Sequence, residues 1–163
     1  MKVVVFSDVH GNRDILERII SFNPDAEYFI SLGDSELPLS YLTDLDIIAI
    51  KGNYPRDAGF AYESEMKLNG VKIFITHGHK YGVHKGLKKI LHKGFKGEYD
   101  LILYGHTHVA RVDKADNLKL INPGSVYRPR SKEPASYLIL NIEKDGTYEY
   151  VFKEAETNQL LEI

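Results

Sequence analysis

Seven side chains of the kinds that bind metal ions follow five apolar runs of this sequence. The runs cover residues 3–6, 28–32, 47–50, 71–75 and 101–104, and they have the apolar character of buried strands. The polar residues that follow them are Asp8, His10, Asp34, Asn53, His77, His106 and His108. Because ligands bind at the carboxyl ends of strands in open α/β sheets, we expect these side chains to converge on one edge.

The chemistry of this set favours two metal ions over one. Imidazoles, carboxylates and an amide oxygen suit divalent Mn, Fe, Zn or Ni, and we take Mn²⁺ as the leading candidate. The set exceeds what one tetrahedral zinc ion takes and fits two ions that share a ligand. A carboxylate suits the shared position because it places two oxygens and a negative charge between the cations, and Asp34 is our choice. Two ions roughly 3.5–4 Å apart make hydroxide from water and clamp phosphate oxygens, which favours phosphoryl esters, although some aminopeptidases also use paired metals.

The elements that must position these residues change in type along the chain. In the N-terminal half the strands alternate with helices. The first predicted helix is capped by Asn12 and carries an apolar stripe over residues 15–20, and a weaker helical pattern lies near residues 37–42. After a short helix near residues 87–91, hairpins dominate. The predicted hairpin turns are Asn69-Gly70, Asp116-Asn117 and Asp145-Gly146. These patterns predict a mixed-sheet α/β layer sandwich with helices on its outer faces.

Length and composition fit one globular domain over residues 1–163. Lys and Arg total 21 against 23 Asp and Glu, a net charge of −2, so nucleic acid is not indicated as a partner. The chain has no cysteine, which excludes disulfides and thiolate ligands. The first apolar run is too short for a signal peptide or a membrane span, so we expect a cytoplasmic protein with no membrane association.

The ordered motifs resemble those of a known family. Asp8-Val9-His10, Gly33-Asp34, Gly52-Asn53, His77-Gly78 and Gly105-His106-Thr107-His108 stand in the order of the calcineurin-like metallophosphoesterase superfamily. The resemblance extends from about residue 5 to at least Ser125. Asn122-Pro123-Gly124-Ser125 is similar to a motif of the small prokaryotic phosphodiesterase branch, whose fold is shared by a retromer subunit of eukaryotes.

This resemblance implies a four-layer αββα sandwich of two mixed β-sheets flanked by helices, with a binuclear metal centre. It further implies that Asp8, His10, Asp34 and His108 hold one ion. The second ion would be held by Asp34, Asn53, His77 and His106. A hydroxide between the metals would attack phosphorus, with Asp34, Asn53 and His77 as catalytic residues.

One departure from the family pattern concerns the proton donor. Many members place His-Asp or His-Glu directly after the asparagine, where the histidine helps the leaving group depart. Here Tyr54 and Pro55 occupy those positions, and the nearest acid is Asp57. The general acid therefore stays open among Tyr54, His79 and a water bound to a metal.

Other polar residues have both a structural and a functional interpretation. Asn12 either caps a helix or touches the substrate phosphate. His79 either supports a metal ligand or is simply exposed. The lysine-rich segment 80–96 is typical of a solvated helix face, but it would also attract an anionic substrate. Arg128 and Arg130 are either surface residues or phosphate contacts.

We therefore expect hydrolysis of phosphate esters, with phosphodiesters as the leading substrate class and small or cyclic nucleotides within it. Substrate preference should depend on the loops at residues 54–60 and 81–93. One alternative is a phosphomonoesterase, which the same metals would support. Another is a non-catalytic protein-binding scaffold of the same fold, which the presence of every candidate ligand disfavours. Assembly into a homo-oligomer is compatible with either function.

Overall fold

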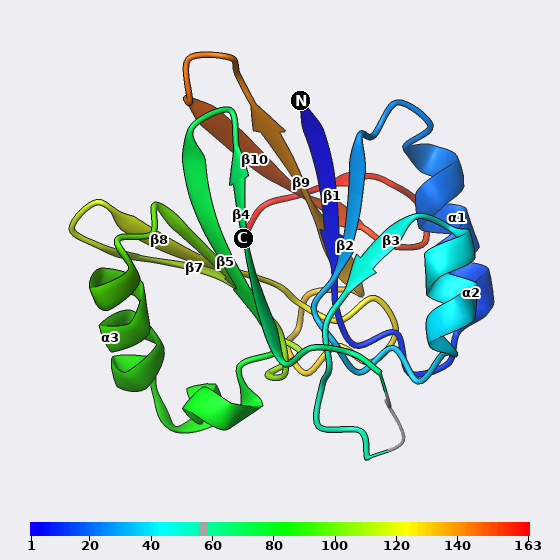
Figure 1. Ribbon diagram of the computed structural model, residues 1–163. Coiled ribbons are helices and arrows are strands. Elements are labelled where there is room, and N and C mark those ends of the chain that lie inside the picture. Colours follow the sequence, from blue (N-terminus) through cyan, green and yellow to red (C-terminus); the bar gives the residue numbers. More distant parts are fainter. Residues whose placement is uncertain (56–58) are drawn as a thin grey trace.

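Two mixed β-sheets pack face to face in the computed structural model, which describes residues 1–55 and 59–163 (Figure 1). One sheet has six strands in the order β11-β10-β9-β1-β2-β3. Its strands are β1 (Lys2–Phe6), β2 (Tyr28–Ser31), β3 (Ile47–Ala49), β9 (Ser136–Ile142), β10 (Tyr148–Glu154) and β11 (Leu160–Leu161). The neighbours β1, β2 and β3 are parallel, whereas β9, β10 and β11 add antiparallel pairs.

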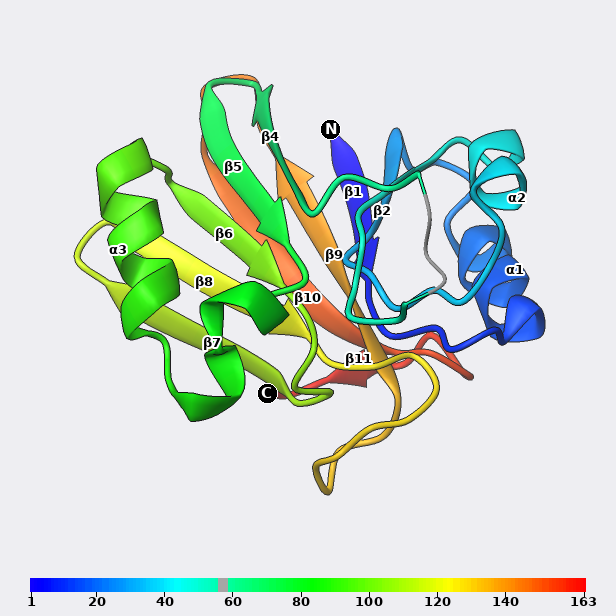
Figure 2. The ribbon, with the colours of Figure 1, turned by 60° about the horizontal axis from the view of Figure 1, so that its bottom comes forward.

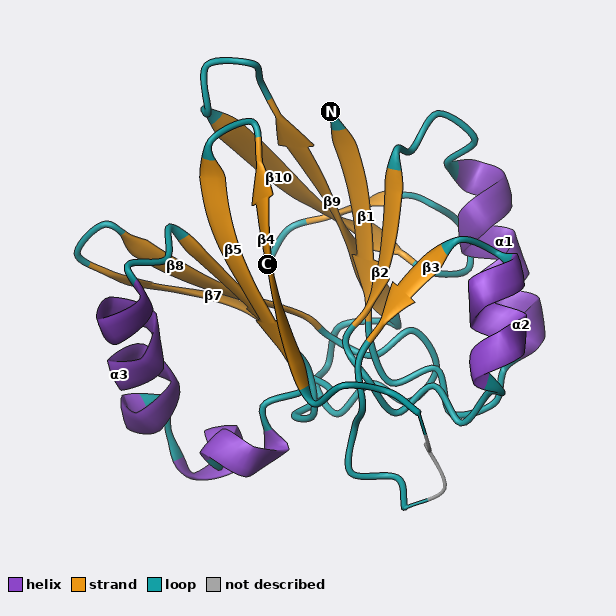
Figure 3. Cartoon of the chain, viewed as in Figure 1, coloured by secondary structure: helices purple, strands orange, loops and turns teal. Residues whose placement is uncertain are grey.

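The second sheet has five strands in the order β4-β5-β6-β8-β7. These are β4 (Glu63–Leu68), β5 (Val71–Thr76), β6 (Leu101–Tyr104), β7 (Ala110–Ala115) and β8 (Leu118–Pro123). The helices α1 (Arg13–Phe22) and α2 (Leu39–Asp44) lie outside the first sheet, and α3 (Lys88–Gly97) lies outside the second (Figure 3). The predicted four-layer αββα sandwich is therefore confirmed.

Alternation along the central strands explains why their sequences are apolar without interruption. In β1, Val3 and Val5 belong to the core between the sheets, whereas Val4 and Phe6 belong to the core beneath α1 and α2. Successive side chains of a strand point to opposite faces, so a strand covered on both sides needs apolar residues at every position. In β5, Ile73 likewise faces the core between the sheets while its neighbour faces the core under α3.

Local signals set the ends of the first helix. The Asn12 side chain accepts a hydrogen bond from the Ile15 backbone N at 3.1 Å, which caps α1 as predicted. At the other end, Asn23 Nδ2 donates to the Ile19 carbonyl at 2.8 Å. The other predicted strands, helices and hairpins are also present, with ends shifted by only a few residues. Strand β11 and the two 3₁₀ turns, His79–Tyr81 and Val83–Lys85, were not predicted because such short segments carry no periodic pattern.

None of the helices in the described part of the chain has the length and apolar character needed to cross a membrane.

Replacing Leu140 by alanine tests the core between the sheets. Leu140 is fully buried in β9, opposite Val3 of β1, so Leu140→Ala should lower the free energy of unfolding by about 2–5 kcal/mol. Leu160→Ala is the matched control, because Leu160 is 62% exposed and its loss should cost less than about 0.5 kcal/mol. Urea unfolding monitored by circular dichroism measures both. Equal destabilisation would contradict this description of the core.

Candidate metal centre

The seven candidate ligands lie where the carboxyl ends of both sheets meet. The parallel strands β1, β2 and β3 of one sheet and β5 and β6 of the other end on the same side of the molecule, at the bottom of Figure 1 and facing the viewer in Figure 2. The first sheet supplies Asp8, His10, Asp34 and Asn53, and the second supplies His77, His106 and His108. The seven side chains converge as expected, but they come from two sheets. The expectation that ligands bind at the carboxyl ends of strands concerned a single open sheet.

Most of these residues have an uncommon backbone conformation. The φ angles are 58° at Asp8, 48° at His10 and Asp34, 72° at His106 and 60° at His108. Positive φ is rare outside glycine, although Asp and His tolerate it better than most residues, and it costs on the order of 1 kcal/mol per residue. A cluster of such residues on one edge indicates a functional site, because the surrounding fold must stabilise a strained backbone there.

Asp8, His10 and His108 form the first close group of possible ligands. Asp8 Oδ2 accepts hydrogen bonds from Ser7 Oγ at 2.6 Å and from His106 N at 3.2 Å. Its other oxygen, Oδ1, is buried and has no hydrogen-bond partner in the described chain, although His108 Nε2 lies 3.0 Å away. One oxygen of Asp8 is thus fixed by the protein and the other is free for a ligand.

The two histidines of this group turn acceptor atoms toward each other. His10 Nδ1 donates to Glu36 Oε1 and His108 Nδ1 donates to the Arg128 carbonyl, each at 2.7 Å. In the neutral rings, the lone pairs are therefore on the Nε2 atoms, which lie only 3.4 Å apart. Two facing lone pairs repel unless a proton or a metal cation lies near them. The donor set therefore fits a divalent cation, and the Nδ1 bonds are those that orient histidine ligands in metal sites.

The second close group comprises Asp8, Asp34 and His77. His77 Nδ1 donates to the Leu32 carbonyl at 2.7 Å, which leaves its Nε2 atom 3.6 Å from Asp34 Oδ2 and 3.2 Å from Asn53 Oδ1. The other oxygen of Asp34, Oδ1, accepts from the Tyr54 backbone N at 2.9 Å. Asp34 therefore repeats the arrangement of Asp8, with one oxygen held by the protein and the other turned toward the group.

Electrostatics couple the carboxylates to the imidazoles. Burial acts to raise the pKa of Asp34, but the His77 imidazole and the Tyr54 N–H outweigh it and lower the pKa to about 2. The pKa of Asp8 is lowered too, because His108 and His77 outweigh its burial. Conversely, burial acts to lower the pKa values of His77 and His108, but Asp34 and Asp8 raise them above the usual value. Both carboxylates are thus ionised at neutral pH, as metal ligands must be.

His106 lies beside these groups but belongs to neither. Its ring centroid is 5.1 Å from that of His77, and burial lowers its pKa to about 4, so the ring is neutral at pH 7. His79 is half-buried against His77 with an unpartnered Nδ1 in the described chain, and burial lowers its pKa as well. Asp57, the acid nearest to Asn53 in sequence, lies outside the described residues.

Several supporting contacts could not be predicted from sequence, although the Asn122–Ser125 motif itself was recognised there. Ser7 and Glu36 orient Asp8 and His10, and Ser125 Oγ donates to the Asp8 carbonyl at 2.9 Å. Asn122 Nδ2 donates to the Gly105 carbonyl at 2.9 Å, so the Asn122–Ser125 motif holds loops from both sheets. The sequence separations are 26 residues for His10 and Glu36 and 117 for Ser125 and Asp8, too far apart for any local pattern.

A model of the calcineurin-like phosphoesterase superfamily domain matches residues 1–145. The chain belongs to this superfamily. The Bacillus subtilis protein named "Probable metallophosphoesterase YsnB" is 31% identical over 147 residues, which cover 90% of this chain and 87% of YsnB. Phosphodiesterase YfcE of Escherichia coli K12 is 27% identical over 168 residues, covering 86% of this chain and 88% of YfcE.

Solved structures agree with this membership of the superfamily. A predicted phosphoesterase from Streptococcus pneumoniae TIGR4 matches with a TM-score of 0.88 and 26% identity, covering 98% of this chain and 92% of that one. Vps29 of Entamoeba histolytica, solved with Zn²⁺, matches with a TM-score of 0.79 and 20% identity over 99% of this chain and 96% of Vps29, which shows the shared fold. The named relatives support a metal-dependent phosphoesterase, and the superfamily implies divalent metal ions.

Adding a methyl group at Gly52 should damage the metal centre without altering a ligand. A Cβ atom at this position would overlap the backbone nitrogen and carboxylate of Asp34, and a backbone atom has nowhere to move. Gly52→Ala should therefore weaken Mn²⁺ binding at least about tenfold, measured by calorimetry. Gly70→Ala, in the β4–β5 turn, is the control, since its φ of 92° strains the backbone but its Cβ would have open space. Equal affinity in the two variants would contradict the close approach of Gly52 to Asp34.

Metal binding should release protons from this site. Because His77 and His108 have raised pKa values, a metal ion must displace protons from them, and the displaced fraction grows as the pH falls. The apparent affinity for Mn²⁺ should consequently be higher at about pH 8 than at about pH 6. Calorimetry in two buffers of different ionisation enthalpy measures the released protons. His92→Gln, on α3, should leave the release unchanged, and an affinity independent of pH would refute the expectation.

Proposed function

We propose that this chain is a binuclear metal-dependent phosphoesterase that hydrolyses phosphodiester bonds, with residues 1–163 acting as one catalytic domain. The observation that carries the proposal is a set of acceptor atoms turned toward one another, beside the second group around His77. Asp8 Oδ1 has no hydrogen-bond partner among the described residues, and the Nε2 atoms of His10 and His108 face each other at 3.4 Å. Two divalent ions, with Mn²⁺ preferred, would supply an activated water as nucleophile and neutralise charge on the phosphate oxygens.

Each ion would have its own ligands and would share one carboxylate. Asp8, His10, Asp34 and His108 would hold the first ion, and Asp34, Asn53, His77 and His106 the second. The assignment of Asp34 as the shared ligand is supported by its electrostatic contact with His77 of one group and His10 of the other, both of which lower its pKa. Asp8 also belongs to both close groups, so metal stoichiometry is the deciding measurement.

The protein itself would position the reacting groups. The Tyr54 N–H and the Leu32 carbonyl fix Asp34 and His77, and Asn53 is exposed, so its amide would meet both an ion and the substrate. A proton must also reach the leaving oxygen. His79 is a poor donor at neutral pH because its pKa is lowered, which favours the other two candidates, Tyr54 and a water bound to a metal.

The substrate class and the two alternatives rest on the relatives. YfcE is named a phosphodiesterase, which supports diester over monoester hydrolysis. A phosphomonoesterase would use the same residues. A non-catalytic protein-binding scaffold is the other alternative, because the fold is shared with Vps29. A scaffold has no need of acceptor atoms that face one another, and for that reason we place it second.

Hydrolysis of bis(p-nitrophenyl) phosphate, with the monoester in parallel, tests the proposal. Chelator-stripped protein should be inactive, and Mn²⁺ should restore cleavage of the diester in preference to the monoester. Asp34→Asn should lower kcat/KM at least about 100-fold and reduce bound Mn²⁺ from two ions to less than one, since both ions lose a ligand. Asp8→Asn should retain one ion, and Asp44→Asn, an exposed carboxylate on α2, should match the wild type.

Two results would overturn these assignments. Retention of one tightly bound ion in Asp34→Asn would show that Asp34 is not the shared ligand. Absence of turnover with Mn²⁺, Fe²⁺, Zn²⁺ and Ni²⁺ would make the scaffold the better interpretation.

A further inference from the structure

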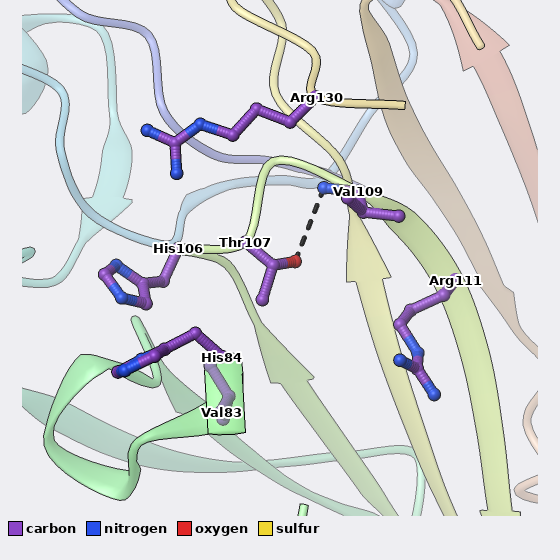
Figure 4. Close-up of a pocket in the computed structure, with 7 residues that line it drawn as sticks. All are labelled: Val83, His84, His106, Thr107, Val109, Arg111 and Arg130. Carbon is purple, nitrogen blue, oxygen red and sulfur yellow. Dashed lines mark hydrogen bonds between the residues drawn. The ribbon is translucent and has the colours of Figure 1, made fainter. Parts of the chain in front are cut away.

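A cavity of about 560 Å³ opens directly beside the metal centre (Figure 4). His106 forms one wall of it, and the remaining described walls come from the Val83–Lys85 turn, from the start of β7 and from the loop that follows β8. Below, "His106 cavity" refers to this space. Its volume lies within the range of roughly 300–1,000 Å³ that is usual for small-ligand sites. A substrate whose phosphate lies at the metal centre would therefore have room here for one of its ester groups.

The two arginines of the His106 cavity differ in their partners. Arg111 is held by Asp113, which accepts from its Nε at 2.7 Å and also pairs with Nη2. Arg130 makes no side-chain hydrogen bond or ion pair with the described residues, and its guanidinium extends above His106 (Figure 4). No carboxylate is among the described residues that line the cavity. Arg130 is thus the cation of this cavity that is available to a ligand.

The backbone of Arg130 is tied to the metal centre. Its N–H donates to the His108 carbonyl at 3.0 Å, and the Arg128 carbonyl accepts from His108 Nδ1 at 2.7 Å. The Arg128 N–H in turn donates to Ser125 Oγ at 2.9 Å, and Ser125 Oγ donates to the Asp8 carbonyl. The same loop thus positions a candidate metal ligand and Arg130. The backbone of Arg130 therefore has a fixed position relative to the metal centre.

The rest of the lining suits a nucleoside-sized group. Val83 and Val109 provide apolar surface, and the exposed imidazole of His84 lies 5.6 Å from the His106 ring, centroid to centroid. Thr107 Oγ1 accepts hydrogen bonds from Asn122 Nδ2 at 3.1 Å and from Val109 N at 3.4 Å, so its own hydroxyl hydrogen is free to be donated. Apolar surface with a few convergent donors is typical of sites for small organic ligands.

We propose that the His106 cavity binds an ester group of the substrate that carries a second phosphate, with Arg130 pairing to that phosphate. The substrate class is then a phosphodiester in which one esterified group is a nucleoside, or a similar ring compound, that carries a second phosphate. A diester without this second phosphate would be a poorer substrate. Guanidinium and phosphate pair through two parallel hydrogen bonds, which gives both strength and orientation. This inference deepens the proposed function and rests on it for the position of the scissile phosphate.

The test compares thymidine 5′-(p-nitrophenyl phosphate) with the same compound carrying a 3′-phosphate, using Mn²⁺-loaded protein. The 3′-phosphate should raise kcat/KM about tenfold or more in the wild type, and Arg130→Gln should remove most of that preference. Arg111→Gln removes a cation that Asp113 already occupies, so the preference should change less than about twofold. The absence of a preference in the wild type, or equal losses in the two variants, would overturn the proposal.

A binding measurement separates this inference from the hydrolase activity. Calorimetric titration of metal-free protein with thymidine 3′,5′-bisphosphate should give a Kd that Arg130→Gln weakens about tenfold and Arg111→Gln does not. Selective weakening without any turnover on the esters would support the cavity and refute only the hydrolase proposal. Turnover of bis(p-nitrophenyl) phosphate with equal bisphosphate affinity in all three proteins would refute only the cavity.

Discussion

The rest of the structure depends on one constraint, which is how each candidate metal ligand uses its two polar atoms. Asp8, Asp34, His10, His77 and His108 each use one polar atom to hold a protein partner and direct the other toward a shared space. Buried acceptors that face one another repel, so the arrangement is costly unless a cation lies between them. Membership of the superfamily implies that this cation is a divalent metal ion.

The packed sandwich offsets the free energy that this edge costs. Its three apolar cores, between the sheets and under the helices on either side, stabilise the fold away from the edge. This stability offsets the strained φ angles and the facing acceptor atoms concentrated there. Glycines complete the edge, because Gly52 lies too close to Asp34, and Gly105 too close to the Ser7 hydroxyl that holds Asp8, for either position to carry a Cβ atom. Stability and chemistry are therefore located in different parts of one molecule.

Charge is also separated across the site. The carboxylates are buried at the base, whereas Arg130 and His84 are exposed around the adjoining cavity, where a polyanionic ester would first meet the protein. The lysine-rich segment is largely the solvated side of α3 and of the turns before it: Ile90 is buried, Lys93 lies over the Phe74 ring and Lys80 over the Tyr62 ring. These contacts favour the structural interpretation of that segment.

The sequence by itself determined the elements and the family. Apolar runs, the Asn12 cap and the Asn69-Gly70 turn act over a few residues, so they could be interpreted without the fold, and the ordered motifs named every candidate ligand. The tertiary structure alone decided how those ligands are oriented. His10 depends on Glu36, Asp8 on the N–H of His106, and His108 on the Arg128 carbonyl, at separations of 26, 98 and 20 residues. Two sheets must pack before such partners meet, and the lone-pair directions and the free guanidinium of Arg130 follow from that packing.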